Sequence, residues 1–346
     1  DGISNTDSIM SQINSSTLRL ENALIHGVHN IAIVAIDSAG NVSDTSNTVS
    51  ITVDLEDPDA PTGVDLKDDS DTGLSISDDK TNDVTPEFTF SGVTSTDSVF
   101  IVTTQDSNTD TVGSGLASST SIDMTTSDLS VVPISYNDGS ITIKGYAMDI
   151  AGNTSDISAS ASLIITLDTS EPTAPTSVVL QSGSDSGIST TDRLTNDTTP
   201  TFTIEGVTST DSVLLIIDGL TASSGIASST SIDLNISSVL TDGSYTVSTQ
   251  TIDVAGNIST ATVSDTLLRI DTQAPSKPSA PDLQASSDSG FLDTDNVTNI
   301  TTPVFNLTGL SSTIDSLALF VDGISNTDSI MSQINSSTLR LENALI

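Results

Sequence analysis

The chain contains no cysteine and no tryptophan, and aromatic residues make up only 3% of it. Without cysteine it can form no disulfide, no thiolate metal site and no cysteine nucleophile. Basic residues are also scarce: 8 Lys and Arg stand against 46 Asp and Glu, which gives a net charge of −38. Phosphate contacts require Lys and Arg, so this balance excludes nucleic-acid binding. No stretch approaches the roughly 20 apolar residues of a membrane-spanning helix, so we expect no membrane insertion of this segment.

Catalytic constellations are missing as well. The two histidines, His26 and His29, lie together in the sequence H-G-V-H. Their spacing is compatible with metal binding, but they have no third partner, and the pattern occurs in one repeat type only. A surface or edge-strand role is therefore favoured for both. No thiol-, histidine- or lysine-centred site recurs along the chain, so we predict that it is not an enzyme and has no catalytic residues.

The acidity of the chain is almost entirely aspartate, because only six of the acidic residues are glutamate. Aspartate has a short side chain that favours turns and supplies oxygen ligands to hard cations from tight loops. A composition rich in Asp, Ser and Thr is also typical of disordered chains. Against disorder, 35% of the residues are apolar, and they occur in short alternating runs.

The chain is repetitive. Residues 322–346 are identical with residues 1–25, an offset of 321 residues. Two markers divide this offset into three units of about 103–114 residues, the size of a small domain. The first marker is D-x-A-G-N, and the second is S-D-[ST]-G followed by T-N-x-[VT]-T-P. We therefore expect the chain to be a window from a tandem array. The first marker occurs at 37–41, 149–153 and 253–257, and the second at 71–86, 185–200 and 288–303.

Short apolar runs separated by turn signals indicate about seven strands in each unit and no helix. This pattern predicts an all-β fold of tandem immunoglobulin-like β-sandwich domains arranged as an extended rod. Residues 54–167 and 168–270 are expected to be complete domains. Residues 1–53 would be the C-terminal part of a domain and 271–346 the N-terminal part of another. The expected strands of the second complete unit are residues 177–180, 199–207, 212–218, 231–236, 242–253 and 266–270.

Successive loops of such a sandwich alternate between its two ends. With strands lettered A to G, the second marker forms the A–B loop at the C-terminal end, and D-x-A-G-N forms the F–G loop at the N-terminal end. Stacking domains head to tail would then bring together the A–B loop of one domain, the linker aspartate, and the F–G loop of the next. For the two complete domains, this joins Asp71, Asp78, Asn82 and Asp168 with Asp149 or Asp253, and the alternation favours Asp253.

Closely spaced carboxylates in loops that contain glycine suit Ca²⁺, which takes 6–8 oxygen ligands in flexible geometry. Ca²⁺ is therefore the expected cofactor, and no other cofactor-binding residue is predicted. The alternative for each aspartate is a turn or capping role without a metal. The aspartates of the B–C loop (Asp97, Asp211 and Asp315) either join the N-terminal end or are plain turn residues. The candidate metal ligands are Asp54, Asp168, Asp271, Asp71, Asp185, Asp288, Asp78, Asp192, Asp295, Asn82, Asn196, Asn299, Asp37, Asp149 and Asp253.

Three segments carry a family resemblance: L-T-D-G-S-Y-T-V at 240–247, T-I-D-V-A-G-N at 251–257, and I-D-T-Q-A-P at 270–275. They resemble the bacterial Ig-like extender domains of giant RTX-type, BapA-like and SiiE-like surface adhesins. The resemblance covers the whole chain. It implies a secreted protein on the bacterial cell surface whose neighbouring repeats bind Ca²⁺ between them. Such an array would project a distal binding region for cell adhesion or biofilm formation.

Two other functions remain open. The chain could belong to a self-assembling extracellular fibre or matrix, in which repeats bind other copies through exposed strand edges. Concentration-dependent polymerisation would distinguish this function from an extender. A glycan- or protein-binding module would instead predict measurable ligand affinity in a single repeat.

Overall fold

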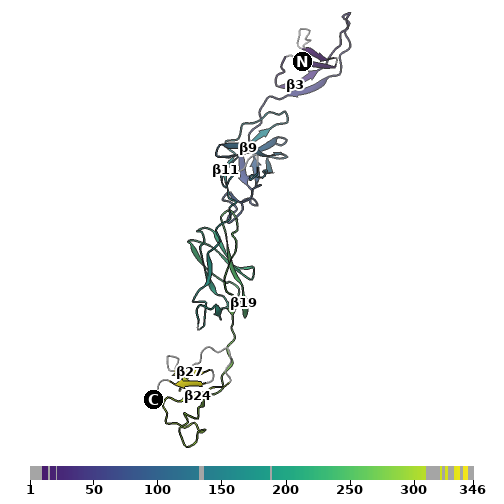
Figure 1. Cartoon of the computed structure of the whole chain (residues 1–346). Helices are drawn as coiled ribbons and strands as arrows, with labels where there is room; N and C mark the ends of the chain where they lie inside the picture. Colours follow the sequence, from purple (N-terminus) through teal and green to yellow (C-terminus); the bar gives the residue numbers. More distant parts are fainter. Residues whose placement is uncertain are drawn as a thin grey trace.

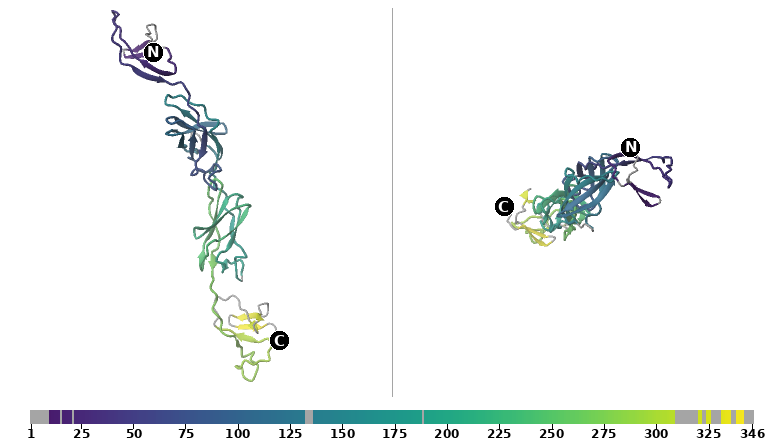
Figure 2. Two further views of the ribbon diagram at one scale, coloured as in Figure 1. Left: turned by 180° about the vertical axis from the view of Figure 1, so that it is seen from behind. Right: turned by 90° about the horizontal axis from the view of Figure 1, so that it is seen from above.

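The computed structural model describes residues 10–14, 16–20, 22–131, 136–187, 189–308, 320–321, 324–325, 331–335 and 338–341. Every regular element among them is a β-strand, which confirms the predicted all-β class. Within this part of the chain, no helix is long and apolar enough to cross a membrane. The units follow one another in a row, with the two termini at opposite ends (Figures 1 and 2).

The first complete unit is a sandwich of two sheets. One sheet has the strand order β10-β7-β5 and the other the order β6-β12-β11-β8-β9. The short strand β6 runs parallel to β12, whereas the other pairs are antiparallel. The strands are β5 (Gly63–Leu66), β6 (Lys80–Thr81), β7 (Glu87–Ser91), β8 (Ser98–Gln105), β9 (Asn108–Leu116), β10 (Ser121–Thr125), β11 (Gly139–Met148) and β12 (Ser162–Leu167).

The second complete unit repeats this arrangement, with the sheets β13-β15-β18, β14-β22-β19 and β17-β16-β20-β21. Here too a short strand, β14, runs parallel to the last strand of the unit, β22. The strands are β13 (Ser177–Leu180), β14 (Leu194–Thr195), β15 (Thr201–Glu205), β16 (Ser212–Ile217), β17 (Leu220–Ile226), β18 (Ser231–Asn235), β19 (Gly243–Tyr245), β20 (Val247–Ile252), β21 (Thr262–Val263) and β22 (Leu268–Ile270).

Several details of the second unit differ from the strands expected from sequence, among them the two-residue strands β14 and β21, which were not predicted. The run 242–253 forms two strands in different sheets, because β19 pairs with β22 while β20 pairs with β16. Strand β17 was not predicted, since its residues are small and mostly polar. It is held by the Asp218–Gly219 turn, in which both residues have positive φ (49° and 82°), as a type I′ hairpin requires.

The core of each complete unit follows from the alternation of its strands. Phe88 and Phe90 of β7, and Phe202 and Ile204 of β15, are fully buried. In the first unit, Ile143 of β11 and the inward residues of β12 belong to the same core cluster as these phenylalanines. Burial of one face per strand is the main favourable term in a sandwich of this size.

The two flanking units contain fewer strands in the described residues. At the N-terminal side, β1 (Met10–Asn14) pairs with β2 (Thr17–Leu20), and β3 (Gly27–Ile31) pairs with β4 (Val49–Val53). At the C-terminal side, one sheet has the order β23-β24-β28-β27. Parts of the predicted units 1–53 and 271–346 lie outside the described residues, as does Asp315. The C-terminal strands are β23 (Asp282–Leu283), β24 (Val304–Asn306), β25 (Phe320–Val321), β26 (Ile324–Ser325), β27 (Met331–Asn335) and β28 (Thr338–Leu341).

Candidate functional site

The F–G loop (residues 37–41, 149–153 and 253–257) builds its own shape from the sequence D-x-A-G-N. The Asp253 Oδ1 atom accepts hydrogen bonds from the backbone N–H groups of Ala255, Gly256 and Asn257 at 2.8–2.9 Å. The Asn257 Nδ2 atom donates to Asp253 Oδ2 at 2.9 Å. The φ angle of Gly256 is +99°, which favours glycine at this position.

The other two F–G loops have the same internal bonds. Asp37 accepts from Ala39 and Asn41, and Asp149 accepts from Ala151 and Asn153. The hydrogen bond from the asparagine side chain is the main reason why the pKa of Asp37 and of Asp149 lies below its usual value. The loop is therefore formed whether or not a neighbouring domain covers it.

The A–B loop (residues 71–82, 185–196 and 288–299) is closed by its first aspartate. The Oδ2 atoms of Asp71, Asp185 and Asp288 accept a backbone N–H eight residues further on, at 3.2, 3.1 and 3.0 Å. These three aspartates are only 2%, 2% and 5% exposed. The Oδ1 atom of each is buried and has no hydrogen-bond partner. Burial, followed by the charge of Asp78, raises the pKa of Asp71.

The two kinds of loop meet at the junction between the complete domains. The Thr72 Oγ1 atom donates to the backbone carbonyl of Ala255 at 2.6 Å. The Asn257 Nδ2 atom donates to the carbonyl of the linker residue Asp168 at 2.8 Å. The backbones approach so closely that a methyl group added at Gly73 would lie 2.2 Å from the Val254 carbonyl oxygen. These contacts confirm that the A–B loop of one domain, the linker and the F–G loop of the next come together.

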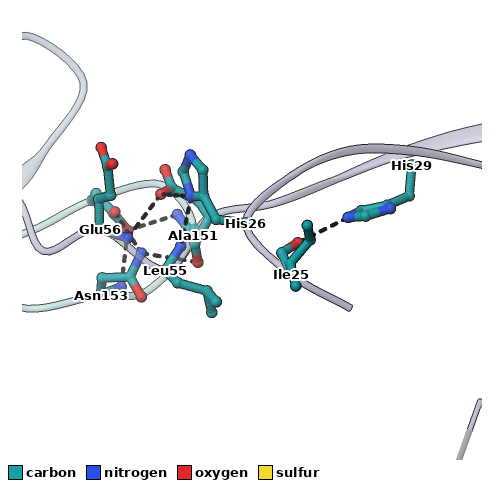
Figure 3. Close-up of polar contacts among 9 residues, drawn as sticks. Ile25, His26, His29, Leu55, Glu56, Ala151 and Asn153 are labelled. Carbon is teal, nitrogen blue, oxygen red and sulfur yellow. Dashed lines mark hydrogen bonds and ion pairs between the residues drawn. The ribbon is translucent and has the colours of Figure 1, made fainter. Parts of the chain in front are cut away.

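The same contacts settle which F–G aspartate belongs to this junction. Asp253 holds the loop that contacts Thr72 and Gly73, whereas Asp149 lies at the junction around Asp54. There, Asn153 Nδ2 donates to the Asp54 carbonyl at 3.2 Å (Figure 3). The expectation from loop alternation, which favoured Asp253, is therefore confirmed.

The histidines of H-G-V-H reach different segments (Figure 3). The His26 Nδ1 atom accepts the backbone N–H of Leu55 at 3.2 Å and lies 3.4 Å from Asp54 Oδ1. The His29 Nε2 atom is instead bonded to the Ile25 carbonyl at 2.8 Å. His26 thus contacts the linker that leads into the first complete domain, while His29 contacts Ile25, just before its own strand β3.

At the junction around Asp271, the A–B loop of the second domain borders an open hollow of about 570 Å³. The Ser186 Oγ atom, which stands where Thr72 stands in the first domain, donates to Asn196 Oδ1 at 2.7 Å. Ser289 makes the equivalent bond to Asn299 at 2.8 Å. The hollow is lined by Ser186, Gly187, Ser189, Asp192, Leu194, Thr195, Asn196, Asp271, Gln273 and Pro275.

The remaining candidate ligands cap turns. The Oδ1 atoms of the linker residues Asp54, Asp168 and Asp271 each accept the backbone N–H two residues ahead. Asp192 and Asp295 do the same, and Asp78 lies 3.3 Å from Lys80 Nζ. In the part of the chain that the structure describes, no three Asp, Glu or His side chains form a group that could hold an ion by themselves. Binding of Ca²⁺ at the A–B loops thus stays a prediction that needs amide, carbonyl or water oxygens as well.

Several contact residues of the junction were not predicted. Thr72, Gly73, Ala255 and Gly256 make the interdomain contact, although their types were visible as the fixed [ST]-G and A-G positions of the two markers. Asp211 of the B–C loop lies near Asp253, and burial, followed by the charge of Asp253, raises the pKa of Asp211. The sequence left Asp211 open between this role and a plain turn.

Comparisons with known proteins agree with this architecture. The sequence profile described as Bacterial Ig-like domain matches residues 59–169, 172–272 and 274–345. No curated protein sequence matches the chain significantly.

Similar solved structures include the chicken CNTN1 FN1-FN3 domains, at 13% identity and a TM-score of 0.37, covering 70% of this chain and 75% of that one. The fibronectin(III)-like modules of Clostridium thermocellum CbhA have 12% identity and a TM-score of 0.33, covering 60% and 93%. A biofilm associated protein BSP domain has 16% identity and a TM-score of 0.19, covering 57% of this chain and 29% of that one.

Proposed function

Because the chain belongs to the Bacterial Ig-like domain family, we propose that it is a structural extender of a large secreted bacterial surface protein. In this proposal, stacked domains form a rod that carries a distal binding region for adhesion or biofilm formation. Ca²⁺ bound at the domain junctions stiffens the rod. The observation that carries the proposal is the buried Oδ1 atom without a partner, present at Asp71, Asp185 and Asp288.

A buried carboxylate oxygen without a hydrogen bond or counter-charge is costly for a folded protein. The cost recurs at the same position of three A–B loops, so it is a property of the repeat. At Asp71 the nearby charge is a second carboxylate, Asp78, which increases the cost. A divalent cation would remove this cost by supplying positive charge to both groups.

The oxygen atoms around Asp71 suit Ca²⁺ more than a transition metal. Hydroxyl, amide and backbone carbonyl groups surround the loop, and no cysteine or histidine belongs to it. Asp71, Asp78 and Asn82 would hold the ion from the A–B loop, and Asp168 would hold it from the linker. Hard oxygen donors in a flexible loop are the usual environment of Ca²⁺ in extracellular modules.

Weak sites suffice for such a role, since extracellular modules bind Ca²⁺ at about 10⁻⁴–10⁻³ M. An ion at about 100 times its dissociation constant adds about 2.7 kcal/mol to the stability of the state that binds it. The same ions neutralise part of the net charge of −38, which otherwise opposes the stacking of domains.

The test is a set of thermal melts of the full chain in EDTA, in Mg²⁺ and in Ca²⁺. We expect a rise of the melting temperature that is specific to Ca²⁺. The substitution Asp185→Asn should reduce this rise, whereas Asp233→Asn, on the exposed side of β18, should leave it unchanged. Identical melting temperatures in the three solutions would mean that the junction aspartates only cap turns and that Ca²⁺ has no part in the function.

A further inference from the structure

The outer face of the larger sheet in the first complete domain carries an aromatic pair. Phe100 of β8 and Tyr146 of β11 are directly opposite each other in the antiparallel ladder, and their rings are stacked, with centroids 4.7 Å apart and planes 6° from parallel. The adjacent residues Val99 and Ala147 are fully buried, so the two rings are on the side of the sheet that faces away from the core. Both rings are half-buried. In a chain with only 3% aromatic residues, this pair does not serve the core of the sandwich.

One side of the stacked pair is open. The distance of 4.7 Å between the centroids matches the separation of neighbouring strands, about 4.8 Å, so the rings are stacked across the strands. On the other side of Phe100, the paired residue is Ser114 of β9, which is exposed. Leu116, two residues further along β9, is 69% exposed. A serine side chain is too short to cover an aromatic ring, so this side of Phe100 is accessible to a flat ligand.

Two polar groups beside the rings have no partner in the part of the chain that the structure describes. Lys144 precedes Tyr146 by two positions and therefore lies on the same face of β11. The other two lysines of this domain pair with carboxylates, whereas Lys144 forms no ion pair or hydrogen bond with a described residue. The hydroxyl groups of the other two tyrosines bond to threonine, whereas that of Tyr146 contacts no described polar group. An ammonium group and a phenol are thus available next to the aromatic pair.

The positions that flank the two rings on β8, β9 and β11 carry no acidic residue, although the net charge of the chain is −38. A carboxylate that approaches over these strands meets the ammonium group of Lys144 and no negative side chain of the strands themselves. Attraction between opposite charges at contact distance is effective even at a protein surface. The flanking positions are Ser98, Val102, Ser114, Leu116, Lys144 and Met148.

The second complete domain has the same fold without these groups. Its strand register puts Leu214, Gln250 and Ser248 at the positions of Phe100, Tyr146 and Lys144. The Gln250 side chain is used within the domain, since it donates to the Ser259 carbonyl at 2.8 Å. The fold therefore does not require the aromatic pair or the lysine, and a function specific to the first complete domain accounts for them.

We propose that the face formed by Phe100, Tyr146 and Lys144 binds a saccharide whose ring carries a carboxylate, as the uronic acid units of acidic polysaccharides do. The apolar side of the sugar ring packs on the open side of Phe100. The Lys144 ammonium group pairs with the carboxylate, and the hydroxyl groups of Tyr146 and Ser114 bond to those of the sugar. This binding goes beyond the proposed extender role and requires no metal ion.

The test is a titration of the full chain with a trimer of galacturonic acid and with the neutral trimer of galactose, followed by tyrosine fluorescence. The chain has no tryptophan to mask this signal, and EDTA prevents ions from bridging the carboxylates. We expect the acidic trimer to bind at least about tenfold more tightly, because only it forms a charge-assisted bond with Lys144. Added salt should weaken its binding.

Three results overturn the proposal: no binding of the acidic trimer, equal binding of both trimers, or equally tight binding of a polyglutamate peptide. The last result would mean that charge alone is recognised and that the sugar ring makes no contact. None of these results concerns the Ca²⁺-dependent rise of the melting temperature. Failure of this proposal therefore leaves the proposed function intact.

Variants that introduce the residues of the second domain are compatible with the fold. Phe100→Leu and Tyr146→Gln should each weaken the binding of the acidic trimer up to about tenfold, the effect of one aromatic contact. Lys144→Ser should remove the preference for the acidic trimer. The controls are Lys67→Ser, on the other sheet, and Phe291→Leu, at a fully exposed phenylalanine of the last unit, and both should bind like the unchanged chain.

The reverse exchange gives the sharpest result. Leu214→Phe, Ser248→Lys and Gln250→Tyr together should create a second site, so that the chain binds two acidic trimers in place of one. Unchanged affinity in all three variants of the first domain, or an equal loss in Lys67→Ser, contradicts binding at this face. Thermal melts of each variant verify that both complete domains remain folded.

Discussion

The A–B loops of the two complete domains have nearly the same internal structure but different surroundings. In both, an aspartate closes the loop through a backbone N–H, at 3.2 Å for Asp71 and 3.1 Å for Asp185. The hydroxyl group that follows differs: Thr72 bonds to the next domain, and Ser186 bonds to its own Asn196. The hydroxyl group that follows the closing aspartate thus has a different partner in the two loops, while the closure by the aspartate is the same.

The A–B loops have two features that are separate in the structure. The contact of Thr72 and Gly73 with the F–G loop is made by protein atoms alone. The unpartnered Oδ1 atoms of Asp71 and Asp185 are a second feature. It is present both in the A–B loop that contacts the next domain and in the A–B loop beside the hollow. Because the second feature does not depend on the contact with a neighbouring domain, the ion binding that we propose and this contact can be altered separately by mutation.

The largest effect is expected for Gly73→Ala. The added methyl group would lie 2.2 Å from the Val254 carbonyl oxygen, so the domains must move apart, at a cost of up to about 3 kcal/mol. Distances between spin labels on cysteines introduced at the exposed positions Leu116 and Leu220 should become broadly distributed. The chain has no other cysteine, so labelling is specific.

Gly187→Ala is the control, since Gly187 and Gly73 both have positive φ (123° and 103°) and share the backbone strain of an alanine. It should leave the label distances unchanged. Equal broadening in both variants would mean that strain within the A–B loop, and not the contact with Val254, determines the junction.

A smaller loss is expected for Asn257→Asp, because Asn257 donates both to Asp253 and to the Asp168 carbonyl. The new carboxylate cannot donate, so both hydrogen bonds are lost, and it faces the carboxylate of Asp253. Together these changes should destabilise the junction by about 2 kcal/mol. Asn41→Asp removes only the bond to Asp37. Chemical unfolding of the two variants should therefore differ by the contribution of the linker bond, and equal losses would assign no energy to it.

Thr72→Val should weaken the junction by about 1 kcal/mol, the net value of its one interdomain hydrogen bond between uncharged groups. It removes the interdomain bond to Ala255 and the acceptor of the Asn82 N–H. Ser186→Ala removes the equivalent acceptor for Asn196 without an interdomain bond. The difference between the two variants in interdomain label distances isolates the contact, and no difference would show that the hydroxyl group is dispensable.

The smallest effect concerns pH. Burial and the charge of Asp253 raise the pKa of Asp211, so its ionised form destabilises the folded domain at neutral pH, and protonation relieves this as the pH falls through the raised pKa. Asp211→Asn should thus stabilise the domain at pH 7, and the gain should shrink toward pH 4. Asp149 has a lowered pKa, so Asp149→Asn should show the opposite sign. Melting temperatures at both pH values check this, and parallel pH profiles in both variants would contradict it.

Much of the fold could be predicted from the sequence, because alternation of apolar residues directly specifies a half-buried strand. The strand around Phe202 is a clear example, since this side chain is fully buried where the alternation of 199–207 places it inward. Strand β17 was missed because it is held by the Asp218–Gly219 turn and by pairing with β16, and its own residues carry little pattern. Local sequence cannot show a strand that depends on its neighbour.

The site was predictable in its arrangement but not in its contacts. Alternation of loops between the ends of a sandwich was enough to pair the A–B loop with Asp253. The direct contact of Thr72 with Ala255 was not foreseen, because it depends on the distance between two backbones at Gly73 and Gly256. Such distances are set by domain packing, which no single loop sequence encodes.

The parallel pairing of β6 with β12 determines how a domain responds to a pulling force along the array. The backbone N–H groups of Thr166 and Asp168 donate to the carbonyls of Asp79 and Thr81, at 2.8 and 2.9 Å. Because the chain leaves the domain just after β12, tension slides β12 along β6 and loads both bonds at once, instead of opening them one after the other. Each domain thus resists stretching by shear at its exit strand, and the second domain has the same geometry at Arg269 and Asp271.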